Sequence, residues 1–157
     1  MIDVASPLPR LAVSCVVLRD QAVLLVRRAR APAKGWWAFP GGSVMAGERV
    51  EHAVRREVLE ETALRVGKPR LLRAHEVIER DETGGRLAHH YVILVHAAEL
   101  EPADTASEPV AGDDAAEARF VAVSALDQLD VLPSVLDVLP SALEALRAPE
   151  AIPTPPA

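Results

Sequence analysis

Runs of aliphatic residues near the start of the chain predict a β-hairpin. Residues 11–19 and 22–28 are rich in β-branched and aliphatic side chains, and a polar pair separates them. Two such runs joined by a short polar break are typical of paired antiparallel strands. A loop over residues 29–35 and a short strand over residues 37–39 are predicted to follow.

A second, longer hairpin is predicted in the middle of the chain. Residues 71–80 and 87–98 are strand-like, and they flank the turn sequence Asp-Glu-Thr-Gly-Gly at 81–85. The composition then becomes polar and rich in proline, which predicts a long loop after residue 100, and loops of that length are often functional. Residues 119–123 are expected to form the last strand.

Helices are predicted for the C-terminal part. We expect a short helix over 124–129 with Ser124 as its N-cap, and a terminal helix over 134–148. Pro140 removes a backbone donor, so a kink or two separate pieces are expected there. The tail 149–157 is rich in proline and is predicted to be disordered.

One further helix, over residues 49–63, carries the strongest chemical signal. At 100° per residue one face collects the apolar side chains Val50, Ala53, Val54, Val58 and Leu64, and the other face collects Glu51, His52, Arg55, Leu59 and Thr62. Glu57, Glu60 and Glu61 fall with the apolar set. Carboxylates on an inward face are costly unless they are paired or bind a cation, and one arginine cannot neutralise three of them. Oxygen ligands of this kind suit a hard divalent cation.

The sequence from residue 42 to residue 64 resembles the Nudix box. That pattern sets a glycine, a glutamate, an Arg-Glu pair, a Glu-Glu pair and a final glycine at fixed spacing, and its slots are filled here by Gly42, Glu48, Arg56, Glu57, Val58, Glu60, Glu61, Ala63 and Leu64. Only Ala63 departs, since the family has glycine there. That position is expected to end the helix in a left-handed conformation, so the substitution affects the cap and not the ligands.

The resemblance covers residues 10–147 and implies an α/β fold, a Nudix-type α/β/α sandwich with a mixed β-sheet in a single domain over 1–157. It also implies Mg²⁺ or Mn²⁺ held by Glu57, Glu60, Glu61 and the carbonyl of Gly42. The reaction it implies is hydrolysis of a diphosphate linkage in a nucleoside diphosphate derivative. ADP-ribose, a nucleoside triphosphate and a nucleotide sugar all stay open as the substrate. A non-catalytic, nucleotide-sensing Nudix-like domain is the alternative.

Candidate catalytic residues follow from the same resemblance. Glu57 and Glu60 serve the metal site, and Arg56 is expected to orient a helix glutamate; its other role would be a structural ion pair. A general base is either a helix glutamate or an acid of the long loop, where Asp113, Asp114 and Glu117 are the candidates and Asp114 is favoured.

Substrate contacts are predicted on the strands beside the box. Arg27 and Arg28 point to opposite sides of their strand, and we expect Arg27 to reach a phosphate. Of the neighbouring Trp36 and Trp37, one is expected to face the core and Trp36 to stack on a base, although a core or edge role is open for each. The glycine pair ending in Gly42 allows a close backbone approach, and Gly41 is included among the substrate-binding residues.

Composition limits the function classes. A chain of 157 residues that is 50% apolar suits one enzyme domain, and a net charge of −6 argues against a general nucleic-acid binder. The single cysteine, Cys15, favours a reducing compartment. No apolar run approaches the roughly 20 residues of a membrane span. We expect a cytoplasmic protein whose partner is a small nucleotide diphosphate, with no nucleic-acid or membrane partner, and the resemblance allows a homodimer.

Overall fold

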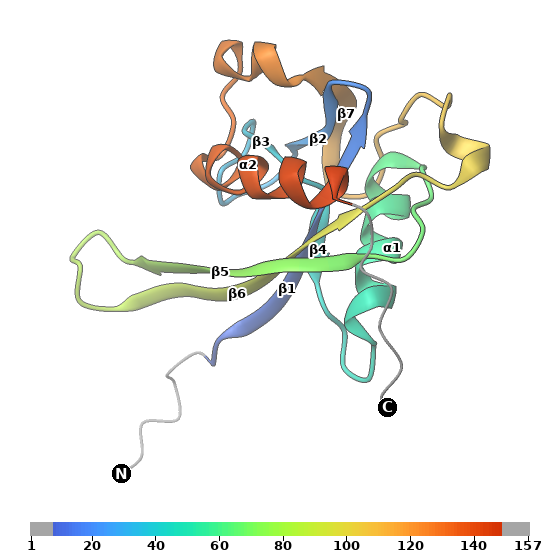
Figure 1. Cartoon of the computed structure of the whole chain (residues 1–157). Coiled ribbons are helices and arrows are strands. Elements are labelled where there is room, and N and C mark those ends of the chain that lie inside the picture. The colour runs from blue at the N-terminus through green and yellow to red at the C-terminus, as the bar shows by residue number, and fades with distance from the viewer. Residues whose placement is uncertain (1–7, 149–157) are drawn as a thin grey trace.

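The structure is a computed structural model that describes residues 8–148 (Figure 1). Its strands, α-helices and 3₁₀ helices follow one another in the order β1 (Arg10–Arg19), β2 (Ala22–Arg28), β3 (Trp37–Ala38), β4 (Gly41–Ser43), α1 (Val50–Thr62), β5 (Arg70–Arg80), β6 (Leu87–Ala98), η1 (Pro102–Asp104), β7 (Ala115–Ala122), η2 (Val123–Gln128) and α2 (Pro133–Arg147). Both predicted hairpins, the central helix and the terminal helix are therefore present.

The strands form one mixed sheet. Its order is β3-β2-β1-β6-β5, with β4 paired to β1 and β7 paired to β2. β1 and β6 run parallel, while the other pairs are antiparallel. The long β5–β6 hairpin extends away from the two helices (Figure 1). The predicted α/β class with a mixed sheet is confirmed.

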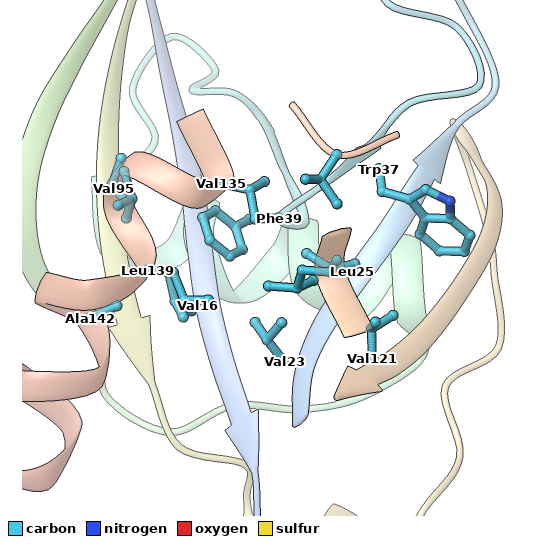
Figure 2. Packing of buried hydrophobic residues seen from close by; sticks show 13 residues of the cluster. Val16, Val23, Leu25, Trp37, Phe39, Val95, Val121, Val135, Leu139 and Ala142 are labelled. Carbon is cyan, nitrogen blue, oxygen red and sulfur yellow. The ribbon is translucent and has the colours of Figure 1, made fainter. Parts of the chain in front are cut away.

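Hydrophobic residues cover both faces of this sheet. One cluster joins Val54 and Val58 of α1 to Val13 and Val17 of β1. The other joins α2 to strand residues that include Val16, and Figure 2 shows it from close by. Neighbouring residues of a strand point to opposite faces, so β1 contributes to both clusters. Each fully buried valine or leucine contributes roughly 1.5–3 kcal/mol, which holds α1 and α2 on opposite sides of the sheet. This is the α/β/α sandwich that the sequence predicted.

The end of α1 has the predicted left-handed geometry. Ala63 follows the helix with φ 59° and ψ 12°, and its N–H donates to the Leu59 carbonyl at 2.9 Å. Thr62 differs from its prediction, because it is fully buried and not on the outer face. Its hydroxyl donates to the Val58 carbonyl at 2.6 Å, which satisfies the polar group inside the protein.

The C-terminal elements depart from the predictions in three places. The first helix after the sheet is the 3₁₀ helix η2, and its N-cap is Ala122 and not Ser124, with no side-chain cap. β7 begins at Ala115, earlier than predicted, because it pairs along the whole of β2. Helix α2 is a single helix through Pro140, which lies on its exposed side. Buried side chains before and after the proline hold both halves on the sheet.

The predicted disorder of residues 149–157 lies outside the described residues. Within residues 8–148, no helix has the length and apolar character needed to cross a membrane.

Candidate metal and phosphate site

Two glycines bring β4 close to both β1 and α1. A β-carbon on Gly41 would overlap the Val13 carbonyl oxygen and lie 2.8 Å from the Ser14 Cα. A β-carbon on Gly42 would lie 2.5 Å from Oε1 of Glu57. Real β-carbons do not approach other atoms this closely, so both positions depend on the missing side chain. The backbone of residues 41–42 therefore forms a surface on which a helix carboxylate rests.

Helix α1 turns two carboxylates toward this surface. Glu57 and Glu61 are each only 7% exposed. The Gly41 N–H donates to Oε2 of Glu61 at 3.0 Å, which means that this N–H orients a glutamate. Burial, with the nearby charges of Glu57 and Asp113, raises the pKa of Glu61 to about 7. The pKa of Glu57 is also raised, mainly by burial. Glu57 and Glu61 are thus two neighbouring buried carboxylates whose negative charge is only partly offset by hydrogen-bond donors.

Arg56 connects the carboxylates at the exposed edge of α1. Its guanidinium donates to Oε1 of Glu57 at 2.7 Å and to Oε2 of Glu60 at 3.1 Å. Its other nitrogens bind both oxygens of Glu48, at 2.7 and 2.9 Å, and the Ser43 carbonyl at 3.1 Å. The two-point bond to Arg56 lowers the pKa of Glu48 to about 2 and raises the pKa of the guanidinium. Glu48 therefore anchors the arginine that touches two box glutamates.

Glu60 was predicted to face inward and does not. Its side chain is 44% exposed, whereas Glu57 and Glu61 are buried. On the helical wheel, Glu60 lies at the border of the apolar stripe next to Arg56, and the ion pair draws its carboxylate to the surface. Of these three helix carboxylates, only Glu57 and Glu61 face the protein body.

The long loop is attached to the carbonyl end of α1. Val110 N–H donates to the Thr62 carbonyl at 2.8 Å, and Gly112 N–H donates to the Glu61 carbonyl at 3.3 Å. A β-carbon on Gly112 would lie 2.5 Å from the Glu60 carbonyl oxygen, so this contact also needs glycine. The loop thereby satisfies carbonyls that a helix end leaves without intrahelical partners.

This attachment decides which loop acid lies near the box. Asp113, with φ 50°, is the residue directly after Gly112, and its charge adds to the burial that raises the pKa values of Glu57 and Glu61. Asp114 forms an ion pair with Arg30 at 3.1 Å. The Asp114 carbonyl also accepts from the Ala29 N–H at 3.0 Å, so this residue ties two loops together.

The two arginines at the end of β2 lie on opposite faces of the sheet, as predicted. Arg27 is opposite Trp37 of β3 and forms an ion pair with Glu117 of β7. Because Trp37 belongs to the cluster on the α2 side, Arg27 lies on the face away from α1. Arg28 lies on the α1 side, and its charge opposes the rise in the pKa of Glu61 that burial causes. The structure brings Arg28, and not the predicted Arg27, toward the carboxylates.

The tryptophan pair divides between core and surface. Trp37 is 5% exposed and packs in the cluster shown in Figure 2, so the prediction that one of the two faces the core is confirmed. The Arg119 guanidinium lies over its ring, 4.5 Å from the centroid. Trp36 is 40% exposed. The side chain that was predicted to contact the substrate is therefore accessible.

The chemistry of the Glu57 and Glu61 carboxylates fits a divalent cation. Glu57 and Glu61 are buried carboxylates with raised pKa values, one of them packed against Gly42, and their oxygen atoms are ligands that a hard cation prefers. Within residues 8–148, no three Asp, Glu, His or Cys side chains are already gathered around one point. Arg56 donates hydrogen bonds to both Glu57 and Glu60.

A large cavity of about 900 Å³ lies elsewhere. It is bordered by the β1–β2 turn, the end of β6 and the last turn of α2, and it shares no residue with the carboxylate site. The carboxylates and glycines lie instead where β4 contacts α1.

A family model describes most of this chain. The model of the NUDIX domain matches residues 8–140. The protein belongs to the NUDIX family. The box helix of this NUDIX protein is α1, and the glycine turn before it is β4.

Similar proteins agree with this assignment. The chain is 37% identical over 121 residues to an ADP-ribose pyrophosphatase of Methanocaldococcus jannaschii, a match that covers 77% of this chain and 66% of that protein. The crystal structure of the MutT NUDIX hydrolase from Burkholderia pseudomallei has 29% identity and a TM-score of 0.68, and covers 86% of this chain and 98% of that one. The NUDIX domain of Shewanella oneidensis NrtR complexed with ADP ribose shares the fold, with 21% identity, a TM-score of 0.69 and coverage of 89% and 90%.

Sequence reasoning did not single out Arg28 or Gly112, and it ranked Asp113 below Asp114. Alternation along β2 shows only that Arg27 and Arg28 lie on opposite faces of the sheet. Which of them faces α1 is decided by the packing of the sheet, so the choice of Arg27 as the phosphate contact had no support from the alternation. The Gly-Asp-Asp sequence at 112–114 was a signal for a tight approach, because a glycine before two acids indicates a backbone that must pass close to something.

Proposed function

We propose that this NUDIX protein hydrolyses a diphosphate linkage in a nucleoside diphosphate derivative, with Mg²⁺ or Mn²⁺. Glu57, Glu60, Glu61 and the Gly42 carbonyl would hold the cation. The observation that carries the proposal is the burial of Glu57 and Glu61 beside a glycine backbone. Such an arrangement is costly in a protein without a positive ligand, and it fits one that binds a cation. When bound, the cation neutralises charge on the phosphate and activates a water molecule.

The remaining residues of the box position these carboxylates. The Gly41 N–H fixes one oxygen of Glu61, and Arg56 fixes one oxygen of Glu57. Glu48 in turn holds Arg56 by two hydrogen bonds. Arg56 is in this view a positioning residue, and its contact with Glu60 keeps that acid available at the surface edge of the site.

We propose a loop acid as the general base, and the geometry favours Asp113 over the predicted Asp114. Asp113 directly follows Gly112, which contacts the carbonyl end of α1, and its charge contributes to the raised pKa values of Glu57 and Glu61; both observations support this choice. Asp114 already has a cationic partner in Arg30. A base must lie within hydrogen-bond reach of the attacking water, and a carboxylate engaged in bridging two loops is less free to do so.

Arg28 is the cation that we propose for a substrate phosphate. It lies on the α1 side of β2, near Glu61, and its Nε donates to the Pro32 carbonyl at 2.8 Å. That bond sets the direction of the guanidinium and leaves its terminal nitrogens for a ligand. ADP-ribose is the first substrate to test, because the similar protein from M. jannaschii is named for that activity. Nucleoside triphosphates and nucleotide sugars are the other classes.

A turnover assay with matched variants tests the proposal. ADP-ribose, the nucleoside triphosphates and UDP-glucose are incubated with the protein and Mg²⁺ or Mn²⁺, and the products are separated by anion exchange. We expect cleavage of at least one substrate, its loss in EDTA, and a fall of roughly 100-fold or more in kcat for Glu61→Gln, since a metal ligand contributes several kcal/mol. Glu51→Gln, an exposed acid on the same helix, is the control and should retain wild-type turnover.

Two results would contradict the proposal. Full Mg²⁺-dependent turnover in a folded Glu61→Gln protein would refute the metal assignment. Tight binding of ADP-ribose by calorimetry without cleavage of any substrate would support the non-catalytic, nucleotide-sensing domain instead.

A further inference from the structure

Trp36, the residue just before β3, is opposite Arg28 of β2. The backbone N–H of Arg28 donates to the backbone carbonyl of Trp36 at 2.9 Å. This pair continues the register in which Val26 is opposite Ala38 and Arg27 is opposite Trp37. Residues opposite one another in an antiparallel pair project from the same face, with β-carbons roughly 4.5–5.5 Å apart. The Trp36 indole therefore lies on the α1 side, beside the guanidinium that acts on Glu61.

The chain around Trp36 is rich in positive charge. Residues 21–47 contain Arg27, Arg28, Arg30 and Lys34 and no acid, in a chain whose net charge is −6. Arg27 and Arg30 have carboxylate partners. In the part of the chain that the structure describes, Arg28 and Lys34 make no ion pair. The segment that carries the accessible Trp36 thus contains four cations and no acid.

These features form a series from the carboxylates outward: Glu61, then Arg28, then Trp36. We propose that Trp36 stacks on the nucleobase of the substrate, while its phosphates lie between Arg28 and the carboxylates. The ring face of tryptophan attracts any planar base, because every base offers a π-face. The substrate class is then nucleoside diphosphate derivatives with little selection among bases. This inference rests on the proposed function, since it places the other half of the same substrate.

The exposure of Trp36 also fits this role better than a docking role. The two residues before it, Lys34 and Gly35, are polar or lack a side chain. Protein docking sites usually need a contiguous apolar patch of several hundred Å². An accessible aromatic ring opposite an arginine is a combination that suits nucleotide binding.

Calorimetry with a matched pair of ligands tests the inference. The ligands are α,β-methylene-ADP, which carries a base and an uncleavable diphosphate, and methylenediphosphonate, which lacks the nucleoside; both are measured with Mg²⁺. For the nucleotide, Trp36→Ala is expected to raise Kd by about 10- to 100-fold and Trp36→Phe by less than about 3-fold. For methylenediphosphonate, neither variant should change Kd. Leu136→Ala, an exposed leucine of α2, is the control for loss of an apolar side chain.

Fluorescence gives a second readout that needs no turnover. The chain has two tryptophans, and Trp37 is buried. We expect α,β-methylene-ADP to quench the wild-type emission and to leave the emission of Trp36→Phe almost unchanged. ADP, GDP, CDP and UDP should quench the wild-type protein with similar Kd values.

The inference is overturned if Trp36→Ala binds the nucleotide as the wild type does, or if it loses methylenediphosphonate by the same factor. These results differ from failure of the proposed function. Stacking at Trp36 without cleavage of any substrate contradicts only the hydrolase, whereas normal cleavage with an unchanged KM in Trp36→Ala contradicts only the stacking.

Discussion

Gly42 and Glu57 are packed so closely that a β-carbon on the glycine would lie 2.5 Å from a carboxylate oxygen of the glutamate. The obstructed atom is the end of a side chain and not backbone. A larger residue at position 42 would therefore displace the carboxylate and leave the fold in place. At Gly41 the obstructed atoms belong to the β1 backbone, which cannot move independently of the sheet.

We accordingly predict different outcomes for two neighbouring substitutions. Gly42→Ala should lower Mg²⁺-dependent turnover by about 100-fold with little change in Tm, because it moves a proposed metal ligand. Gly41→Ala should lower the free energy of unfolding by about 1–3 kcal/mol, because it crowds a packed strand pair. Turnover and denaturant unfolding of both variants check this. Equal effects on stability, or an active Gly42→Ala protein, would contradict the assigned contact.

The loop acids are distinguished by a second pair of variants. Asp113→Asn is predicted to lower kcat by about 10²- to 10⁴-fold, the usual contribution of a general base. Asp114→Asn removes the partner of Arg30 and should cost less than about 10-fold, since an exposed ion pair contributes little. Single-turnover kinetics with the best substrate measure both. A larger loss for Asp114→Asn would return the role of base to that residue.

The alanine at the end of α1 predicts a stabilising substitution. Ala63 has φ 59°, a conformation that glycine adopts without strain and alanine does not. Ala63→Gly should raise the free energy of unfolding by about 1 kcal/mol, or Tm by about 3 °C, and leave turnover unchanged. Ala111→Gly, at a position without positive φ, is the control and should give no gain. A lower Tm for Ala63→Gly would contradict the cap.

A pH dependence of stability is predicted from His96. Burial lowers the pKa of this imidazole below its usual value of 6.5, and its Nδ1 lies 2.9 Å from the Leu94 carbonyl. The unfolded chain therefore takes up a proton first as pH falls below 6.5. The stability contributed by neutral His96 is complete above that pH and is lost as pH falls toward the lower folded pKa.

Comparison of variants isolates this effect from other titrating groups. The free energy of unfolding of the metal-free wild type, relative to that of His96→Gln, should decrease between pH 7.5 and pH 5.5. The exposed His52→Gln variant should follow the wild type. A constant difference between the wild type and His96→Gln across this range would show that burial of His96 does not affect its titration.

The acidic helix α1 could be predicted from the sequence because its signal is local. The 3.6-residue period places Glu57 and Glu61 with Val54 without knowledge of any other element, although the same reasoning wrongly turned Glu60 inward. The left-handed stop at Ala63 followed in the same way from its place in the box, and the strands followed from the aliphatic runs that form them.

The positions of the arginines of β2 and of the loop acids could not be predicted to the same extent. Alternation shows that Arg27 and Arg28 point apart, but which one faces α1 depends on how β2 is covered by helices that come much later in the chain. The same holds for the surroundings of Asp113 and Asp114, which depend on the attachment of the loop at Gly112 to the end of α1.

The sequence by itself determined the helix with its acids, the glycine turn that precedes it, and the α/β class, because these depend on short-range periodicity and on backbone freedom at single residues. Only the tertiary structure decided that Glu60 lies at the surface, that Arg28 and Trp36 share the face of α1, and that Asp113 lies near the buried glutamates. Those relationships join residues far apart in the chain, and they come from packing two layers of helices on opposite faces of one sheet.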